Sequence, residues 1–303
     1  MIKTSVLAAI TLASLALSLS PAQAGSANRA WVSGHGSDAA GCGAPTNPCR
    51  TFQYVHDNVI AAGGEIAALD PAGYGPLTIA QAVSVQGHGF ASISATSGGD
   101  AIVISAGASD TILLNGLLLD GEGAGRDGVL VNAAGSVQIV NCVIRHFDHG
   151  VDYEASDAAV LSISNTITSD EVGPAAGGAL GVLIQPQSGN PRVMLDAINA
   201  THDNRGVVVA GGQVMLSNSN LSNNNYGLLV GGGQILVKNS VLSNNGDAGV
   251  WTFSPTWLAG AAIYGNGTGV LIQGGAVNSF GDNDIANNGA DVSGGSMTSV
   301  SPQ

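Results

Sequence analysis

One pattern recurs along most of the chain: a glycine followed by a short run of β-branched or leucine residues. Successive glycines of this kind stand 20 to 25 residues apart, except for one step of 31 that contains the glycine-rich segment 173–178. They are Gly128, Gly150, Gly181, Gly206, Gly227, Gly249 and Gly269. Self-similarity at a fixed period of this length is typical of a solenoid, in which each repeat packs only against its neighbours.

Composition narrows the kind of solenoid. Of the 303 residues 45 are glycine, only 10% are charged and 4% are aromatic, while 45% are hydrophobic. So few charged helix formers among so many glycines disfavour helical repeats, and the many Val, Ile and Leu residues exclude disorder. The composition therefore indicates short strands joined by glycine and asparagine turns.

Each repeat contains two further strand segments separated by a single turn residue, an asparagine. The asparagines occupy the same place in four repeats: Asn141, Asn165, Asn218 and Asn239. Asparagine tolerates the left-handed conformation that a sharp corner needs, and stacked amides can hydrogen-bond along a column. Three strands in each coil leave no room for the helix of a leucine-rich repeat.

With these features the chain resembles the right-handed parallel β-helix of the pectate-lyase-like superfold, including its asparagine ladder. More narrowly, segments 29–34, 48–52, 63–66 and 69–75, with the ladder coils, resemble a group of exported bacterial β-helix repeat proteins. The likeness covers nearly the whole mature chain. It implies an all-β, single-stranded right-handed parallel β-helix with a short N-terminal capping helix, and an exported location, but no particular reaction.

Four segments follow along the chain. Residues 1–24 are expected to be a cleaved signal peptide, with Lys3 before a short apolar stretch and a small-residue cleavage site, which predicts a secreted or periplasmic protein. Residues 25–64 hold a tight loop suited to a Cys42–Cys49 disulfide, then a capping helix from Thr51 to Gly63. The β-helix is predicted over 65–292 and a polar tail over 293–303.

Charge and hydropathy exclude two classes of partner. The formal net charge is −13, so the surface repels phosphate backbones and nucleic acid is excluded as a partner. After the first 24 residues no apolar stretch is long enough to cross a bilayer, so no membrane span is predicted.

The outward face of the first strand in each coil is mostly apolar. The second residue after each turn glycine should point outward, which gives Leu130, Asp152, Leu183, Val208, Leu229, Trp251 and Leu271. Contiguous apolar surface usually marks an interface. We therefore predict that this row is covered by the chain's own loops or by a second copy, in a non-catalytic cell-surface, adhesive or glycan-contacting module.

The alternative is a polysaccharide lyase or glycoside hydrolase that works in the polar loops before the first strands. Its candidate catalytic residues are Arg145, Asp148, His149, Asp152, Asp170 and Arg205. In a lyase, Arg145 or Arg205 would be the base, and Ca²⁺ would be held by Asp148, Asp152, Asp170 and Glu171. In a hydrolase, Asp148 and Asp152 would be the acid and base. Otherwise no cofactor or metal site is predicted.

Other features bear on this choice. The Asp-Asp and Arg-Ile-Lys motifs of polygalacturonase-like enzymes and the Trp-Ile-Asp-His run of pectate lyases are absent. Trp251, Trp257 and Tyr264 fall close together in the sequence and are expected to cluster, either burying one another or stacking on sugar rings. Cys142 follows a ladder asparagine and is predicted to be a buried, inert thiol.

Overall fold

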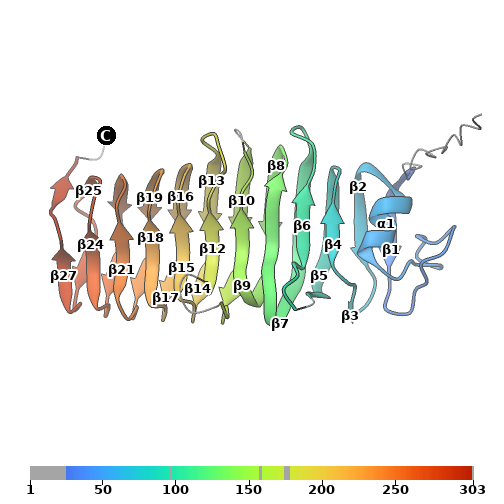
Figure 1. Cartoon of the computed structure of the whole chain (residues 1–303), viewed down its shortest axis with the longest axis horizontal. Helices are drawn as coiled ribbons and strands as arrows, with labels where there is room; N and C mark the ends of the chain where they lie inside the picture. The colour runs from blue at the N-terminus through green and yellow to red at the C-terminus, as the bar shows by residue number, and fades with distance from the viewer. Residues whose placement is uncertain (1–24, 96, 157–158, 174–177, 302–303) are drawn as a thin grey trace, which may run out of the picture.

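The computed structural model describes residues 25–95, 97–156, 159–173 and 178–301, so the predicted signal peptide lies outside the described residues. The chain forms a rod of stacked coils, with the blue N-terminal part at one end and the red C-terminal part at the other (Figure 1). Every pairing between named strands is parallel, which defines a parallel β-solenoid of about ten coils. The predicted all-β fold class is confirmed.

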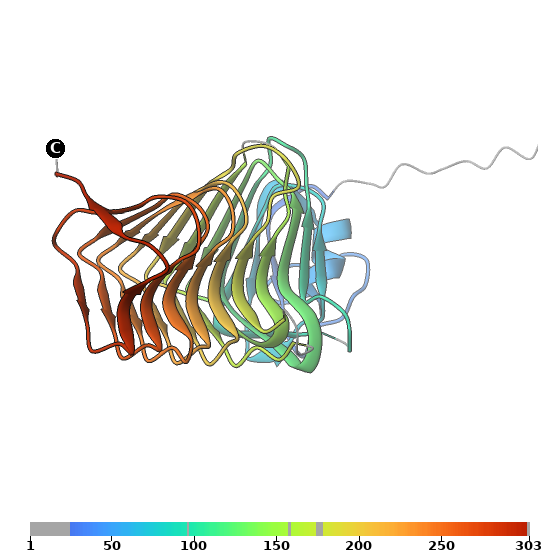
Figure 2. The same cartoon turned by 60° about the vertical axis from the view of Figure 1, so that its left-hand side comes forward.

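The strands lie in three stacks that run the length of the rod (Figure 2). The first stack contains β4 (Leu77–Ile79), β6 (Ile102–Ser105), the ends of β7 (Thr111–Ala133) and β9 (Val143–Tyr153), β12 (Leu180–Ile184), β15 (Arg205–Val209), β18 (Tyr226–Val230), β21 (Ala248–Thr252), β24 (Thr268–Ile272) and β27 (Ala290–Ser293).

The second stack contains β1 (Ala27–Val32), β2 (Ile60–Ala68), the starts of β5 (Val83–Ser94) and β7, β8 (Ser136–Val140), β10 (Val160–Ser164), β13 (Arg192–Asp196), β16 (Gln213–Ser217), β19 (Gln234–Lys238), β22 (Thr256–Ala259), β25 (Val277–Ser279) and β28 (Met297–Ser299). The third contains β3 (Ala72–Gly73), the end of β5, the middle of β7, the start of β9, β11 (Ile167–Ser169), β14 (Asn199–Thr201), β17 (Asn220–Ser222), β20 (Val241–Ser243), β23 (Ala262–Tyr264) and β26 (Asp284–Ala286).

One short helix, α1 (Phe52–Asn58), covers the N-terminal end of the rod (Figure 1). Thr51 caps it, because its side chain accepts a hydrogen bond from the backbone N–H of Tyr54. Phe52 and Val55 are fully buried against the first coils. The helix ends earlier than Gly63, the predicted stop, because Ile60 already belongs to β2 and pairs with β1.

The structured ends of the solenoid extend beyond the predicted segment bounds. β1 lies in the segment 25–64, which was expected to precede the β-helix, and pairs with β2, mostly with residues 65–68. At the other end, β28 forms within 293–303, the predicted polar tail, and pairs with β25. The Cys42–Cys49 disulfide is present, with the two Cα atoms 5.0 Å apart. Cys142 is buried, as predicted, and burial raises the pKa of its thiol to about 11.

Inward side chains form continuous columns along the core. In the second stack Ile139, Ile163, Leu195, Leu216 and Val237 are register partners on successive strands, and all are fully buried. Truncation of such a residue to alanine typically costs about 2–5 kcal/mol, because neighbouring coils cannot close the cavity. The columns explain why each coil keeps the same alternation of Val, Ile and Leu.

The predicted asparagine column forms the corner between the second and third stacks. Asn141, Asn165, Asn218 and Asn239 all have a positive φ, between 47° and 55°, so the predicted left-handed corner is confirmed. Their side chains are exposed, however, and the column is interrupted by Ala197, which takes the same conformation. Asn165 Nδ2 donates to Asn141 Oδ1 over 2.6 Å.

A second column of side chains, not anticipated from the sequence, lies buried between the third and first stacks. Its members are Glu171, Asp203, Asn224, Asn245, Asn266 and, half-buried at the C-terminal end, Asn288. Each accepts a hydrogen bond from a backbone N–H one coil earlier. We call these six residues the buried ladder.

The buried ladder explains the turn glycines from which the repeat is recognised. A Cβ on Gly227 would lie 2.9 Å from Asn245 Nδ2 and 2.7 Å from the carbonyl oxygen of Gly249. Gly249 is crowded in the same way by Asn266. Glycine therefore recurs because a ladder amide of the next coil fills the space that a side chain would need.

Candidate active site

The outward row of the first stack is largely closed by its own members. Leu183 and Val208 are each 7% exposed and pack with Leu180 and the half-buried Leu229 in an apolar cluster separate from the core. Trp251 is half-buried further along. The expectation that the chain covers this row is met in part by neighbouring side chains, whereas cover by a second copy stays a prediction.

Three ionisable side chains meet at the N-terminal side of this apolar cluster. Asp127 and His149 are register partners on β7 and β9, and Asp152 lies three residues after His149. His149 Nδ1 lies 2.8 Å from Asp127 Oδ1 and 3.7 Å from Asp152 Oδ2. Both carboxylates are almost completely buried, at 2% and 4% exposure. We call Asp127, His149 and Asp152 the acid–histidine cluster.

Further polar side chains hold the two carboxylates in place. Arg126 Nε lies 3.0 Å from Asp127 Oδ2, and the same guanidinium donates two hydrogen bonds to Asp100. Gln185 Nε2 lies 3.0 Å from both carboxylate oxygens of Asp152. These contacts fix the carboxylates before any ligand arrives, which is the arrangement that a preorganised site requires.

Burial sets the protonation of the cluster. It raises the pKa of Asp152 to about 6, although the hydrogen bond from Gln185 opposes the shift. Burial also raises the pKa of Asp127, against the hydrogen bond from His149. For His149 burial acts in the lowering direction, but the hydrogen bond and charge of Asp127 outweigh it and the pKa is raised. The cluster thus holds acids that titrate close to neutral pH, as acid–base catalysis requires.

The geometry leaves one ring nitrogen for a ligand. Because Nδ1 of His149 faces both carboxylates, Nε2 is the atom that can exchange a proton with a bound molecule. One ligand atom from each of the three residues also lies within 4.8 Å of the others, so the cluster is able to hold a cation. A set with an imidazole nitrogen suits a transition metal better than Ca²⁺, which prefers oxygen ligands.

The predicted calcium ligands do not assemble. Asp170 lies on an exposed corner in a left-handed conformation, with its carboxylate 3.8 Å from His202 Nδ1. Glu171 belongs to the buried ladder. Asp148 Oδ1 is buried against the backbone of Gly173 and Gly178. The hydrolase pair Asp148–Asp152 likewise receives no support, because Asp127 and not Asp148 meets Asp152 at His149.

The two predicted arginine bases lie in different places. Arg145 lies in the third stack, where its Nε contacts Asp120 Oδ2 at 3.0 Å, and so it is on another face of the rod. Arg205 occupies the same register as His149, two strands further along the first stack. At about 4.8 Å per strand this places the two backbones about 10 Å apart.

The three predicted aromatic residues do not cluster. Trp257 lies on β22 in the second stack and Tyr264 on β23 in the third, whereas Trp251 lies on β21 in the first. Trp251 instead stacks on Tyr226, with ring centroids 4.8 Å apart, and contacts Phe253 at 5.2 Å. Sequence proximity was misleading because residues six or more apart in one coil turn onto different faces.

Two site residues were missed by sequence reasoning: Asp127 as a member of the cluster, and Tyr226 as the stacking partner of Trp251. The signal was available, because both stand directly before a turn glycine, at the position that His149 occupies in its own coil. Reading that position along the repeat gives a second outward row of Asp127, His149, Leu180, Arg205 and Tyr226.

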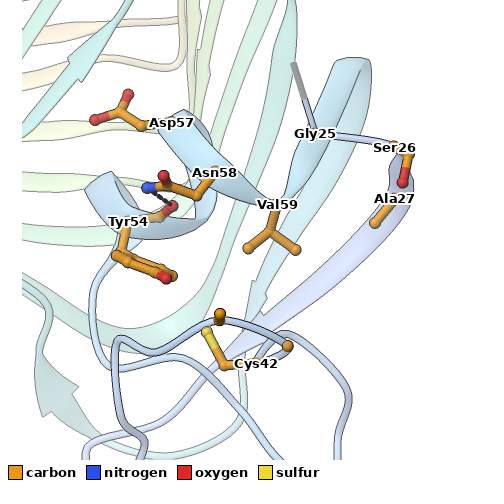
Figure 3. Close-up of a pocket in the computed structure, with 10 residues that line it drawn as sticks. Gly25, Ser26, Ala27, Cys42, Tyr54, Asp57, Asn58 and Val59 are labelled. Atoms are coloured by element: carbon orange, nitrogen blue, oxygen red, sulfur yellow. Dashed lines mark hydrogen bonds between the residues drawn. The ribbon is translucent and has the colours of Figure 1, made fainter. Parts of the chain in front are cut away.

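A cavity of about 530 Å³ lies elsewhere, beside α1 at the N-terminal end (Figure 3). Small residues and backbone form much of its wall, together with Tyr54, Asp57 and Asn58. The hydrogen bond drawn there runs from Asn58 Nδ2 to the carbonyl oxygen of Tyr54, within the last turn of α1. Asp57 is the single carboxylate in the cavity wall, so this cavity offers no acid–base pair.

Comparison with known proteins identifies the fold. Residues 205–301 match the sequence model of a family described as "Right handed beta helix region". A crystal structure of the pectate lyase Pel9A is similar over 88% of this chain and 80% of that chain, with a TM-score of 0.60 and 15% identity.

The A-module of the Azotobacter vinelandii mannuronan C-5 epimerase AlgE4 is similar over 80% of this chain and 91% of its own, with a TM-score of 0.46 and 17% identity. No curated protein matches the sequence. The chain is thus a right-handed β-helix with the pectate-lyase-like fold, and the predicted handedness is confirmed. In the described part of the chain no helix is long and apolar enough to cross a membrane.

Proposed function

We propose that the protein is a polysaccharide lyase that cleaves a uronate-containing polymer at the acid–histidine cluster. The observation that carries this proposal is the contact of His149 Nδ1 with two buried carboxylates, Asp127 and Asp152, on the outward face of the first stack. It provides a base whose second nitrogen is open and an acid that titrates near neutral pH.

The cluster accounts for the proton transfers of a β-elimination. Nε2 of His149 removes the proton from C5 of the uronate, the electron pair forms the C4–C5 double bond, and the bond from C4 to the glycosidic oxygen breaks. Asp152 gives its proton to the leaving oxygen. Asp127, held by Arg126, fixes the tautomer of His149 and stabilises the imidazolium that forms. Solvent then takes the proton from Nε2 of His149 and supplies one to Asp152, which restores the starting protonation of both residues.

Elimination fits the spacing better than hydrolysis does. Glycosidases place two carboxyl groups about 5–9.5 Å apart, so that one acts on each side of the scissile bond. Here the ligand atoms of all three residues lie within 4.8 Å of one another and come from one side, the face of a single stack. Groups on one side of the sugar can both remove a proton and protonate the leaving oxygen.

Residues further along the face support an elongated ligand. Arg205 and Tyr226 follow His149 in the same register, and Trp251 stacks on Tyr226. A guanidinium is suited to a uronate carboxylate, and an aromatic ring to the apolar face of a sugar. The distance along the rod from Asp152 to Trp251 spans four strand spacings, about 19 Å, which suits a polymer better than a small molecule.

A second candidate is a non-catalytic glycan-contacting or adhesive module. The observation that favours it is the apolar cluster of Leu180, Leu183 and Val208, which lies between the acid–histidine cluster and the aromatic pair. These three side chains are almost fully buried, so contact with a second copy or with a cell-surface glycan would be made by the half-buried Leu229, Trp251 and Leu271 of the same row. For both candidates we propose export, supported by the Cys42–Cys49 disulfide, because disulfides persist in oxidising compartments.

One experiment separates the candidates. The purified protein is incubated with uronate and neutral polysaccharides, with and without added divalent cations, while the absorbance of unsaturated products and the number of reducing ends are followed. Unsaturated products that disappear in His149→Ala and remain in His202→Ala, a matched change at an exposed corner, support the lyase. Retention on a polysaccharide matrix without any product supports the module and overturns the lyase.

A further inference from the structure

The buried ladder changes chemistry part of the way along the rod. In its last four members an asparagine Oδ1 accepts a backbone N–H, and Nδ2 donates to a backbone carbonyl in an earlier third-stack strand. Asn224 donates to Ala200 and Asn245 to Leu221, for example. Each amide therefore satisfies a donor and an acceptor that the stacking of coils would leave unpaired.

Glu171 and Asp203 occupy positions of the buried ladder but carry a carboxyl group where the other members carry an amide. Glu171 Oε2 accepts the N–H of Phe147 and Asp203 Oδ1 accepts the N–H of Glu171, as an asparagine would. Their other oxygens, Oε1 and Oδ2, are buried and have no hydrogen-bond partner among the described residues. Asn224 donates to the carbonyl of Ala200, and Thr168 is the strand partner of Ala200 one coil earlier. The equivalent carbonyl for Asp203 is therefore that of Thr168.

We propose that Glu171 and Asp203 are neutral carboxylic acids whose O–H groups replace the ladder amides, and that Glu171 thereby positions the turn that carries His149. A protonated carboxyl has one donor and one acceptor, which is the complement that an asparagine supplies at the other rungs. An ionised carboxylate would place a lone pair against a carbonyl oxygen in the protein interior, which is strongly unfavourable.

The surroundings favour the neutral form. Burial raises the pKa of Asp203 to about 8 and that of Glu171 to about 10, and the negative charge of Asp170 adds to both shifts. Asp120, on the preceding corner, contributes a further negative charge to the site of Glu171. The cationic groups of these corners are engaged with other acids: Arg145 and His146 contact Asp120, and His202 faces Asp170.

The connection to the acid–histidine cluster is direct. The backbone N–H that Glu171 Oε2 accepts belongs to Phe147, two residues before His149, and the two atoms are 2.5 Å apart. A Cβ on Gly150, the residue after His149, would lie 2.8 Å from Glu171 Oε1. Glu171 therefore holds the backbone before His149 by a hydrogen bond and lies close to Gly150 after it. This inference concerns the fold of that turn and does not depend on the reaction proposed above.

The test compares Asp203→Asn and Glu171→Gln with the unaltered protein. Because unfolded Asp203 ionises near 3.8 and the folded residue near 8, the unfolded chain binds fewer protons in this window, and stability falls as pH rises through it. Asp203→Asn should remove part of that fall in the thermal midpoint. The matched control, Asp282→Asn, changes an exposed acid that is remote from both carboxyl groups and should retain the full fall.

Spectroscopy reports the positioning role separately. Backbone amide signals of residues 147–149 should shift as Glu171 ionises, near pH 10, and this shift should be absent in Glu171→Gln. The infrared band of a protonated carboxyl should lose intensity near pH 8 in the unaltered protein but not in Asp203→Asn. Glu171→Gln should keep the turn ordered, whereas Glu171→Ala should not. A thermal midpoint with the same pH dependence in Asp203→Asn and the unaltered protein, or no infrared band of a protonated carboxyl at pH 7, would overturn the proposal.

Discussion

Substitution of Asn245 by alanine should reveal how much of the stability comes from the buried ladder. Its Oδ1 accepts the N–H of Asn224 at 3.1 Å, and its Nδ2 donates to the carbonyl of Leu221 at 3.1 Å and to Asn266 Oδ1 at 2.9 Å. Alanine leaves two buried groups, the N–H of Asn224 and the carbonyl of Leu221, without this partner, at about 1–3 kcal/mol each, whereas Asn266 Oδ1 keeps the backbone N–H of residue 245. We expect a loss of about 2–6 kcal/mol in the free energy of unfolding.

The matched control is Asn218→Ala in the exposed column. There one exposed hydrogen bond, to Asp196 at 2.7 Å, is lost, and alanine must take a φ of 51° at a cost of about 1–2 kcal/mol. We expect a loss of about 1–2 kcal/mol. Guanidinium denaturation followed by tryptophan fluorescence gives both midpoints. Equal losses in the two variants, or a larger loss for Asn218→Ala, would refute the claim that burial of the amide column supports the coils.

Two further changes test the site and the entry loop. Asp152→Asn should raise stability at neutral pH by about 1–3 kcal/mol, because burial raises the pKa of the folded residue to about 6 and its ionisation is therefore unfavourable as pH rises from 3.8. In pH-dependent melting the loss of stability over that interval should be smaller in the variant than in the unaltered protein, and equal losses would contradict the prediction. Replacement of both Cys42 and Cys49 by alanine should cost about 2–4 kcal/mol in chemical denaturation, and a reductant should then have no effect on the midpoint; an unchanged midpoint in the variant would show that the disulfide does not stabilise the fold.

The architecture could be predicted from the sequence because the same pattern recurs in every coil. The turn glycines and the alternation of apolar residues give strand positions that agree across seven coils, so an error at one coil is corrected by the next. The exposed asparagine column was found because Asn in a left-handed corner has a local cause. The segment bounds were less certain, since Ile60 is compatible with both a helix stripe and an inward strand position.

The site was harder to predict because its members meet across paired strands and are not neighbours in the sequence. Asp127 and His149 meet because 22 residues separate two equivalent positions, and this is visible only after the position before each turn glycine is aligned. Glu171 was assigned to a calcium site because a carboxylate in a loop resembles a ligand. Its burial in a column of asparagines depends on the way the corner turns inward, which no local pattern reports.

The regular register has a practical consequence for anyone who wishes to alter the molecule's length. From Asn204 onward, equivalent rungs are 21 residues apart for at least one full turn, as the Asn204–Asn225 hydrogen bond shows. Excision of residues 206–226 would join Arg205 to Gly227 and shorten the rod by one spacing, about 4.8 Å. Trp251 would then approach His149 by that amount, and Arg205 would take the position of Tyr226 beside it. The separation of two binding features along the rod can therefore be changed in whole strand spacings by removing whole coils.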